Sequence, residues 1–152
     1  MTDRASSVSL LNQTSVRQWI CVILDMLESL SDYDLQVRGW TGAGPEVWSP
    51  CEAADEAEYI QIDAFLQQTG IALSSDTIAS IHRLIRFIDE SDILDDETAT
   101  AADTPVWVEI RRLAAEGLIH FANDVGHAGF GDLAAMSSAE RIRVQNWQCP
   151  DP

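Results

Sequence analysis

The sequence predicts an all-α fold, an irregular bundle of five or six helices. The bundle is expected to form a single domain over residues 1–152, with short flexible ends at about 1–12 and 148–152. Apolar residues recur every three or four positions in nearly every segment, which is the period of an amphipathic helix. Ser or Thr residues that can cap a helix precede these segments. No segment shows the period-2 alternation of a β-strand. A chain of this length can bury a sizeable core without disulfides.

The first helix is predicted from about residue 15 to residue 31, and its pattern can continue toward Arg38. Thr14 or Ser15 can cap its start. Gly39 and the Gly/Pro-rich stretch that follows are expected to break the helix. Its apolar residues form one stripe, made of Val16, Trp19, Ile20, Ile23, Leu24, Leu27 and Leu30.

The clearest helix start in the sequence is a capping box formed by Ser49 and Glu52, with Pro50 at the first helical position. This second helix is predicted to continue to about Gln68 and to end at Gly70. The apolar residues of its first half are mostly Ala, which allows a neighbouring helix to approach closely.

A third helix is expected to start at Ser74 or Ser75, and its apolar residues share one face as far as Ile88. An acidic stretch from Asp89 to Glu97 follows, and then a linker of small residues. Acidic side chains at a helix C-terminus oppose the helix dipole. We therefore expect this stretch to be a loop or the start of another short helix.

The last two helices also have clear starts. Thr104 and Pro105 predict the start of a fourth helix that ends near Asn123. The three glycines of the next segment, GHAGFGD, predict a loop. A second capping box, Ser137 with Glu140, predicts a final helix that continues to about residue 147.

The chain is strongly and unevenly acidic. It has 25 acidic residues against 9 basic ones, all of them Arg, and a net charge of -16. Residues 43–104 alone hold 14 acidic residues and 2 Arg, hence a net charge of -12. Such a chain repels nucleic-acid phosphates and anionic membrane surfaces. We expect no direct nucleic-acid binding and no membrane binding, and a partner that is a cation, a basic protein or a neutral ligand. The alternative is that the charge only keeps the protein soluble.

The cysteines and the N-terminal sequence suggest a cytoplasmic protein. The three cysteines, Cys21, Cys51 and Cys149, are odd in number and have no CxxC spacing, which argues against a zinc ribbon or a redox pair. The first residues lack the basic and apolar regions of a signal peptide. We therefore expect a reducing compartment and no cofactor.

Two groups of side chains have spacings that metal sites use. The first is Glu116, His120 and Asp124, and the second is Glu52, Asp55 and Glu56. No facing ligands on another helix are evident, and a solvated helix face gives the same pattern. The sequence also lacks a nucleophile motif and a phosphate-binding loop. We expect neither catalytic residues nor a metal site, and we keep a metal-dependent helical hydrolase of a nucleotide-like substrate as the alternative.

Four of the five tryptophans raise distinct expectations. Trp19 and Trp107 lie on apolar stripes and are expected in the core. Trp40 and Trp48 lie in the Gly/Pro-rich stretch between the first two helices. They either plug the end of the bundle or form an exposed aromatic anchor for a partner.

The acidic charge and the lack of catalytic motifs together predict a non-enzymatic binding protein that inhibits or neutralises a basic partner protein. Immunity proteins and antitoxins act in this way on a toxin or a nucleic-acid-acting enzyme. Electrostatic steering speeds such an association, and buried anchors slow its reversal. A structural subunit of a homo-oligomer is a further alternative, and the oligomeric state stays open. The predicted partner-binding residues are Asp89, Glu90, Asp92, Asp95, Asp96 and Glu97, with Glu52, Asp55, Glu56 and Trp48 as a second group.

Overall fold

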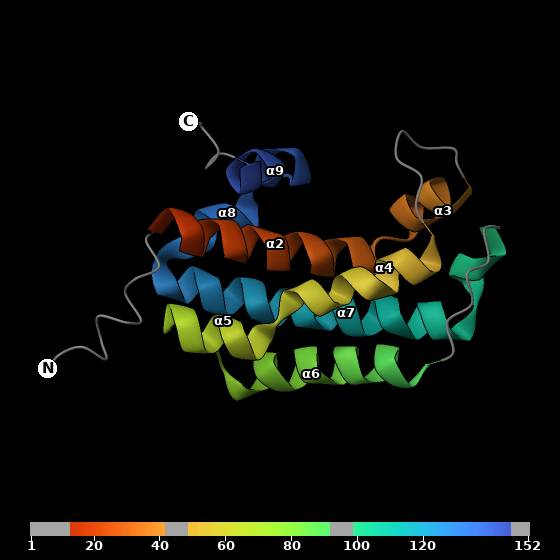
Figure 1. The fold of residues 1–152 in the computed structure, drawn as a ribbon, viewed down its shortest axis with the longest axis horizontal. Coiled ribbons are helices and arrows are strands. Elements are labelled where there is room, and N and C mark those ends of the chain that lie inside the picture. Colours follow the sequence, from red (N-terminus) through yellow and green to blue (C-terminus); the bar gives the residue numbers. More distant parts are fainter. Residues whose placement is uncertain (1–12, 42–48, 92–98, 147–152) are drawn as a thin grey trace, which may run out of the picture.

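The computed structural model describes residues 13–41, 49–91 and 99–146, and every regular element in these ranges is helical (Figure 1). The all-α prediction is therefore confirmed for the described residues. The elements are α2 (Gln13–Ser31), α3 (Tyr33–Thr41), α4 (Pro50–Glu56), the 3-10 helix η1 (Ala57–Ile60), α5 (Ile62–Thr69), α6 (Ser75–Glu90), the 3-10 helix η2 (Ala99–Asp103), α7 (Pro105–Val125), the π-helical turn η3 (Gly126–Phe130), α8 (Gly131–Ala135) and α9 (Ser138–Asn146). The two expected flexible ends, 1–12 and 148–152, lie outside the described residues.

The two longest helices, α2 and α7, lie side by side and form the centre of the bundle (Figure 1). α6 packs on α7, on the side away from α2, while α9 packs on α2. α4 and η1 contact α2, and they lead into α5, in front of the central pair in Figure 1. α6 and the α4–η1–α5 segment are thus each supported by the central helices.

One apolar cluster fills the space between these helices. The stripe predicted on α2 faces it, and Ile20, Ile23 and Leu27 are fully buried. The ring of Phe65 from α5 meets that of Phe121 from α7 edge-on, with the ring centroids 5.7 Å apart. Burial of these side chains is the main force that holds the helices together.

The structure confirms the predicted starts of α4, α7 and α9, whereas Thr14 and Ser15 lie inside α2, so neither caps its start. The hydroxyl of Ser49 accepts a hydrogen bond from the Glu52 amide at 3.1 Å, and the Glu52 carboxylate accepts one from the Ser49 amide at 2.8 Å. Ser137 and Glu140 form the same reciprocal pair at 3.2 and 2.8 Å. Thr104 caps α7, with Pro105 in its first turn. These contacts satisfy amide groups that lack partners inside the helix.

The prediction of five or six helices was too low, because segments expected to be continuous or irregular form separate helices. The pattern that continued toward Arg38 belongs to a separate helix, α3. Asp32 precedes α3 and caps it, because its carboxylate accepts a hydrogen bond from the Leu35 amide at 3.0 Å. Gly39 lies inside α3 and does not break it. Trp40 of the same helix is only 3 % exposed. Tertiary packing therefore overrides the local signal of Gly39.

The predicted loop at GHAGFGD is also helical. Residues 126–130 form the π-helical turn η3, with a kink at Gly129, and α8 follows directly. Gly129 has φ 98°, which a residue without a Cβ adopts at no steric cost. The side chains of Phe130 and Leu133 are buried in the core. The glycines therefore bend the helical chain and do not end it.

Trp40 closes one end of the core. Its ring lies edge-on to that of Trp107, with the centroids 4.7 Å apart, and both side chains are buried. For Trp40, the interpretation as a plug is confirmed. Trp48 lies outside the described residues.

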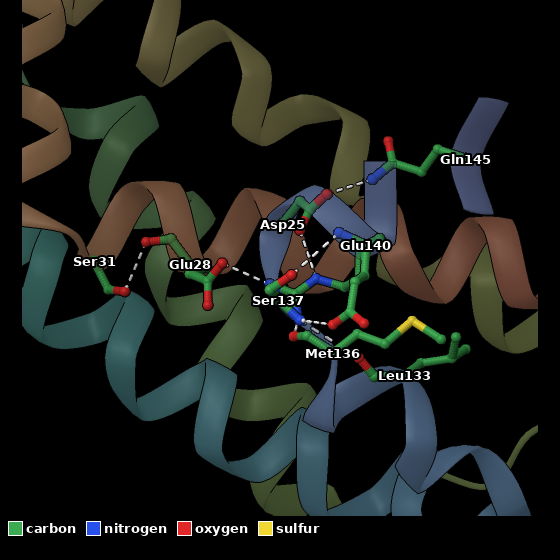
Figure 2. Close-up of polar contacts among 9 residues, drawn as sticks. Asp25, Glu28, Ser31, Leu133, Met136, Ser137, Glu140 and Gln145 are labelled. Carbon is green, nitrogen blue, oxygen red and sulfur yellow. Dashed lines mark hydrogen bonds and ion pairs between the residues drawn. The ribbon is translucent and has the colours of Figure 1, made fainter. Parts of the chain in front are cut away.

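A buried ion pair fixes α9 on α2 (Figure 2). Arg141, 2 % exposed, donates to Asp25 at 2.6 Å, to Glu28 at 2.5 Å and to the Met136 carbonyl at 2.6 Å. Gln145 donates to the second oxygen of Asp25. Burial disfavours the charged guanidinium, but the hydrogen bond and charge of Asp25 outweigh this and raise the pKa of Arg141. A buried charge of this kind persists only when it is paired and hydrogen-bonded.

Candidate functional site

Five of the ten predicted partner-binding residues lie in the described part of the chain, and all five are exposed. Asp89 and Glu90 end α6, while Glu52, Asp55 and Glu56 belong to α4. The two predicted groups therefore come from separate helices. The other five, Asp92, Asp95, Asp96, Glu97 and Trp48, lie outside the described residues.

A groove of about 680 Å³ lies between η1 and α5 on one side and α6 on the other. Its apolar floor is formed by side chains that are buried or half-buried, Ala57, Ile62, Ala64 and Ile85. Its charged rim is formed by exposed side chains, Glu58, Asp63, His82, Arg86, Asp89 and Glu90. The groove therefore combines an apolar surface with a mainly acidic border.

A smaller hollow of about 310 Å³ continues this groove toward α4. Glu58 and Asp89 line both, so the two share a border. Asp55 of α4 lines the smaller hollow. We call the two together, with their rim and floor, the acidic groove. The structure thus brings Asp55 of the second predicted group to the same surface as Asp89 and Glu90 of the first.

Glu52 and Glu56 do not line the acidic groove. The carboxylate of Glu52 is engaged in the capping box with Ser49. Glu52 therefore helps to start α4, and its contact with a partner stays a prediction.

One side of the groove is formed by η1 and α5, and the chain turns between them at Gln61. Gln61 ends η1 and precedes α5 with φ 42° and ψ 55°, the left-handed conformation. It is the only residue other than Gly with positive φ among the described residues. This conformation costs an L-residue with a side chain about 1–2 kcal/mol. The sequence predicted an unbroken helix here, because no Gly or Pro marks the turn.

One ion pair joins the two sides of the groove. His82 of α6 and Asp63 of α5 approach to 3.0 Å. Asp55, Glu58, Asp89 and Glu90 form no ion pair with a basic side chain among the described residues. Among the described residues, Arg86 is the one Arg in the lining of the groove. The acidic groove therefore attracts positive charge.

Sequence reasoning missed several residues of the groove. Glu58 lies three residues after Asp55, and Arg86 three residues before Asp89, so helical spacing could have placed each beside its neighbour. The pairing of His82 with Asp63 required the relative positions of α5 and α6. No local pattern in the sequence carries that information.

Two residues of the α7 stripe whose spacing resembles that of a metal site have structural partners instead. Glu116 pairs with Arg83 of α6 at 3.2 Å. Asp124 accepts hydrogen bonds from the Ser74 amide at 2.7 Å and the Thr77 hydroxyl at 2.6 Å, at the start of α6. Burial alone raises the pKa of Asp124, but these hydrogen bonds outweigh it and hold that pKa below its ordinary value. Within residues 13–41, 49–91 and 99–146, no three His, Cys, Asp or Glu side chains form a group that could hold a metal ion.

Cys21 belongs to the core. It is fully buried on α2, and burial, followed by the nearby charge of Asp25, raises the pKa of its thiol to about 11. The thiolate is the nucleophilic form of cysteine, so a thiol with this pKa is unreactive at neutral pH.

Comparisons of the chain with protein-family models, with curated proteins and with solved structures found no match. None of the helices in the described residues is both long and apolar enough to cross a bilayer. Fold and site define a helical bundle with an acidic, apolar-floored groove. Because a fold by itself does not determine function, the functional argument rests on the chemistry of this groove.

Proposed function

We propose that this protein is a non-enzymatic binding protein that uses the acidic groove to hold a basic partner protein and thereby inhibits or neutralises it. The observation that carries the proposal is the set of carboxylates without ion-pair partners in the described chain, Asp55, Glu58, Asp89 and Glu90, gathered from α4, η1 and α6 around one groove. The partner class that fits is a toxin or a nucleic-acid-acting enzyme, as for immunity proteins and antitoxins.

The physical reason is complementarity of charge. A protein that acts on nucleic acid presents Lys and Arg to phosphates. Carboxylates held around a groove can occupy such a cationic surface and exclude the anionic substrate. The net charge of -16 also steers a basic partner toward this protein over distances near the Debye length, about 8 Å at physiological salt.

The proposal also places the protein in the cytoplasm, with neither a cofactor nor direct contact to nucleic acid. Two features support this. Cys21 is a free thiol in the core, which fits a reducing compartment. The net charge of -16 opposes contact with phosphates.

The proposal can be tested by capture from a lysate of the source cells on immobilised protein, washed at low and then at high salt. We expect a stoichiometric partner with a high isoelectric point that high salt releases. The double variant Glu58→Gln/Asp89→Asn should retain several-fold less of it at low salt, because two rim charges are lost.

The matched control is Asp34→Asn/Asp76→Asn, which makes the same change in net charge at exposed positions in the first turns of α3 and α6. Asp76 lies 13 residues before Asp89, about 20 Å along α6. This variant should retain the partner as the wild type does. Equal losses in both double variants would show that only net charge matters, and would contradict a role for the acidic groove.

A further inference from the structure

We infer that the acidic groove accepts an amphipathic basic helix of the partner protein. The inference rests on the proposed function and specifies what enters the groove. The floor offers apolar contact, while Asp55 and Glu58 on one side and Asp89 and Glu90 on the other place carboxylates along both borders. A matching segment has one apolar stripe with Arg or Lys on each side of it.

The elements that border the groove favour a helix over an extended segment. Extended peptides bind mainly by adding a strand to an exposed sheet edge, where backbone groups are unpaired. The groove is lined by helices, whose unpaired backbone groups are confined to the first and last turns and form no continuous edge. A segment that docks here gains no backbone ladder, so it must satisfy its own amides, and a helix does so.

The dimensions of the groove agree with this occupant. Along α6 its rim extends from His82 to Glu90, a rise of about 12 Å along the helix axis. This length matches about two turns of a docked helix, enough for apolar side chains at positions i and i+4. The small side chains of Ala57 and Ala64 leave room in the floor for large apolar residues. Carboxylates on both borders can then pair with flanking guanidinium groups.

The test uses a fluorescent helical peptide of about 18 residues, long enough to form a helix in water, with two Leu four positions apart and Arg on both sides of them. A scrambled peptide has the same composition and charge but no apolar stripe. Fluorescence anisotropy should give a Kd about tenfold lower for the amphipathic peptide. Equal affinity for both peptides, or binding of neither, would overturn the inference.

Two variants locate the binding. Ala64→Phe fills the floor from α5 and should raise the Kd about tenfold. Ala139→Phe, at an exposed position on α9 that does not line the groove, should leave it unchanged. Glu58→Gln/Asp89→Asn changes only exposed side chains and serves if Ala64→Phe does not fold. It should raise the Kd and reduce its salt dependence. An unchanged Kd in the folded groove variants would overturn the inference.

The outcomes separate this inference from the proposed function. If both peptides bind equally but the Glu58→Gln/Asp89→Asn variant still loses the captured partner, the proposed function stands and the helical occupant is wrong. If this variant retains the captured partner as well as the wild type does, the proposed function fails.

Discussion

At the scale of single residues, Gln61 carries a conformational cost beside the acidic groove. Its left-handed backbone conformation lies between η1 and α5, and its side chain is exposed in the lining of the groove. Glycine is the residue that adopts this conformation without a steric cost. Strained positions of this kind gather at binding sites, where they serve function rather than stability.

We expect Gln61→Gly to raise the free energy of unfolding by up to about 1 kcal/mol. Glycine removes the steric cost in the folded state, and this gain exceeds the extra conformational entropy that glycine gives the unfolded chain. The control is Gln67→Gly, at an exposed position inside α5, which should lower it by about 1 kcal/mol. Urea denaturation measures both. A loss of stability in Gln61→Gly equal to that in Gln67→Gly would refute the claim that this backbone is strained.

At the scale of helices, α9 depends on polar contacts more than on apolar burial. Ile142 is 49 % exposed and Val144 is only half-buried. The side chain of Arg141 is buried beside Asp25 instead, and it joins α9 to α2. The ion pair therefore positions the last helix.

We expect Arg141→Met to lower the free energy of unfolding by about 3–5 kcal/mol, because Asp25 is left buried without its cation. Adding Asp25→Leu should recover most of that loss, since the uncompensated charge is removed. Arg143→Met, at an exposed position on the same helix, should change stability by less than about 0.5 kcal/mol. Denaturant unfolding of the wild type and these three variants measures the differences. No recovery in the double variant would contradict a buried-charge penalty.

The sequence predicted those elements whose boundaries are set by neighbouring residues. Capping by Ser49, Ser74, Thr104 and Ser137 depends on contacts three residues away, so the starts of α4, α6, α7 and α9 were found. The pairing of Arg141 with Asp25 joins residues 116 positions apart and leaves no local signal. The same holds for the approach of α4 and α5 to α6, which creates the acidic groove. The sequence predicted two sets of partner-binding carboxylates, but it did not predict that residues of both sets line one surface.

At the scale of the whole molecule, the excess negative charge belongs to the stretch of sequence that contributes the groove. Residues 43–104 include α4, η1, α5 and α6, and they carry 14 of the 25 acidic residues. The segments before and after them are close to balanced. A field of one sign around a groove accelerates the approach of an oppositely charged partner and weakens as salt is added. We therefore expect the acidic groove to act mainly on the rate at which the partner associates.

The most direct measurement is the association rate constant of the purified partner with wild-type protein, Glu58→Gln/Asp89→Asn and Asp34→Asn/Asp76→Asn, followed by stopped-flow fluorescence across a range of ionic strength. We predict that the groove variant associates about three- to tenfold more slowly at low salt, with a shallower salt dependence, while the control stays within about twofold of wild type. Rates that fall equally in both variants, or in neither, would contradict a role for the acidic groove in binding.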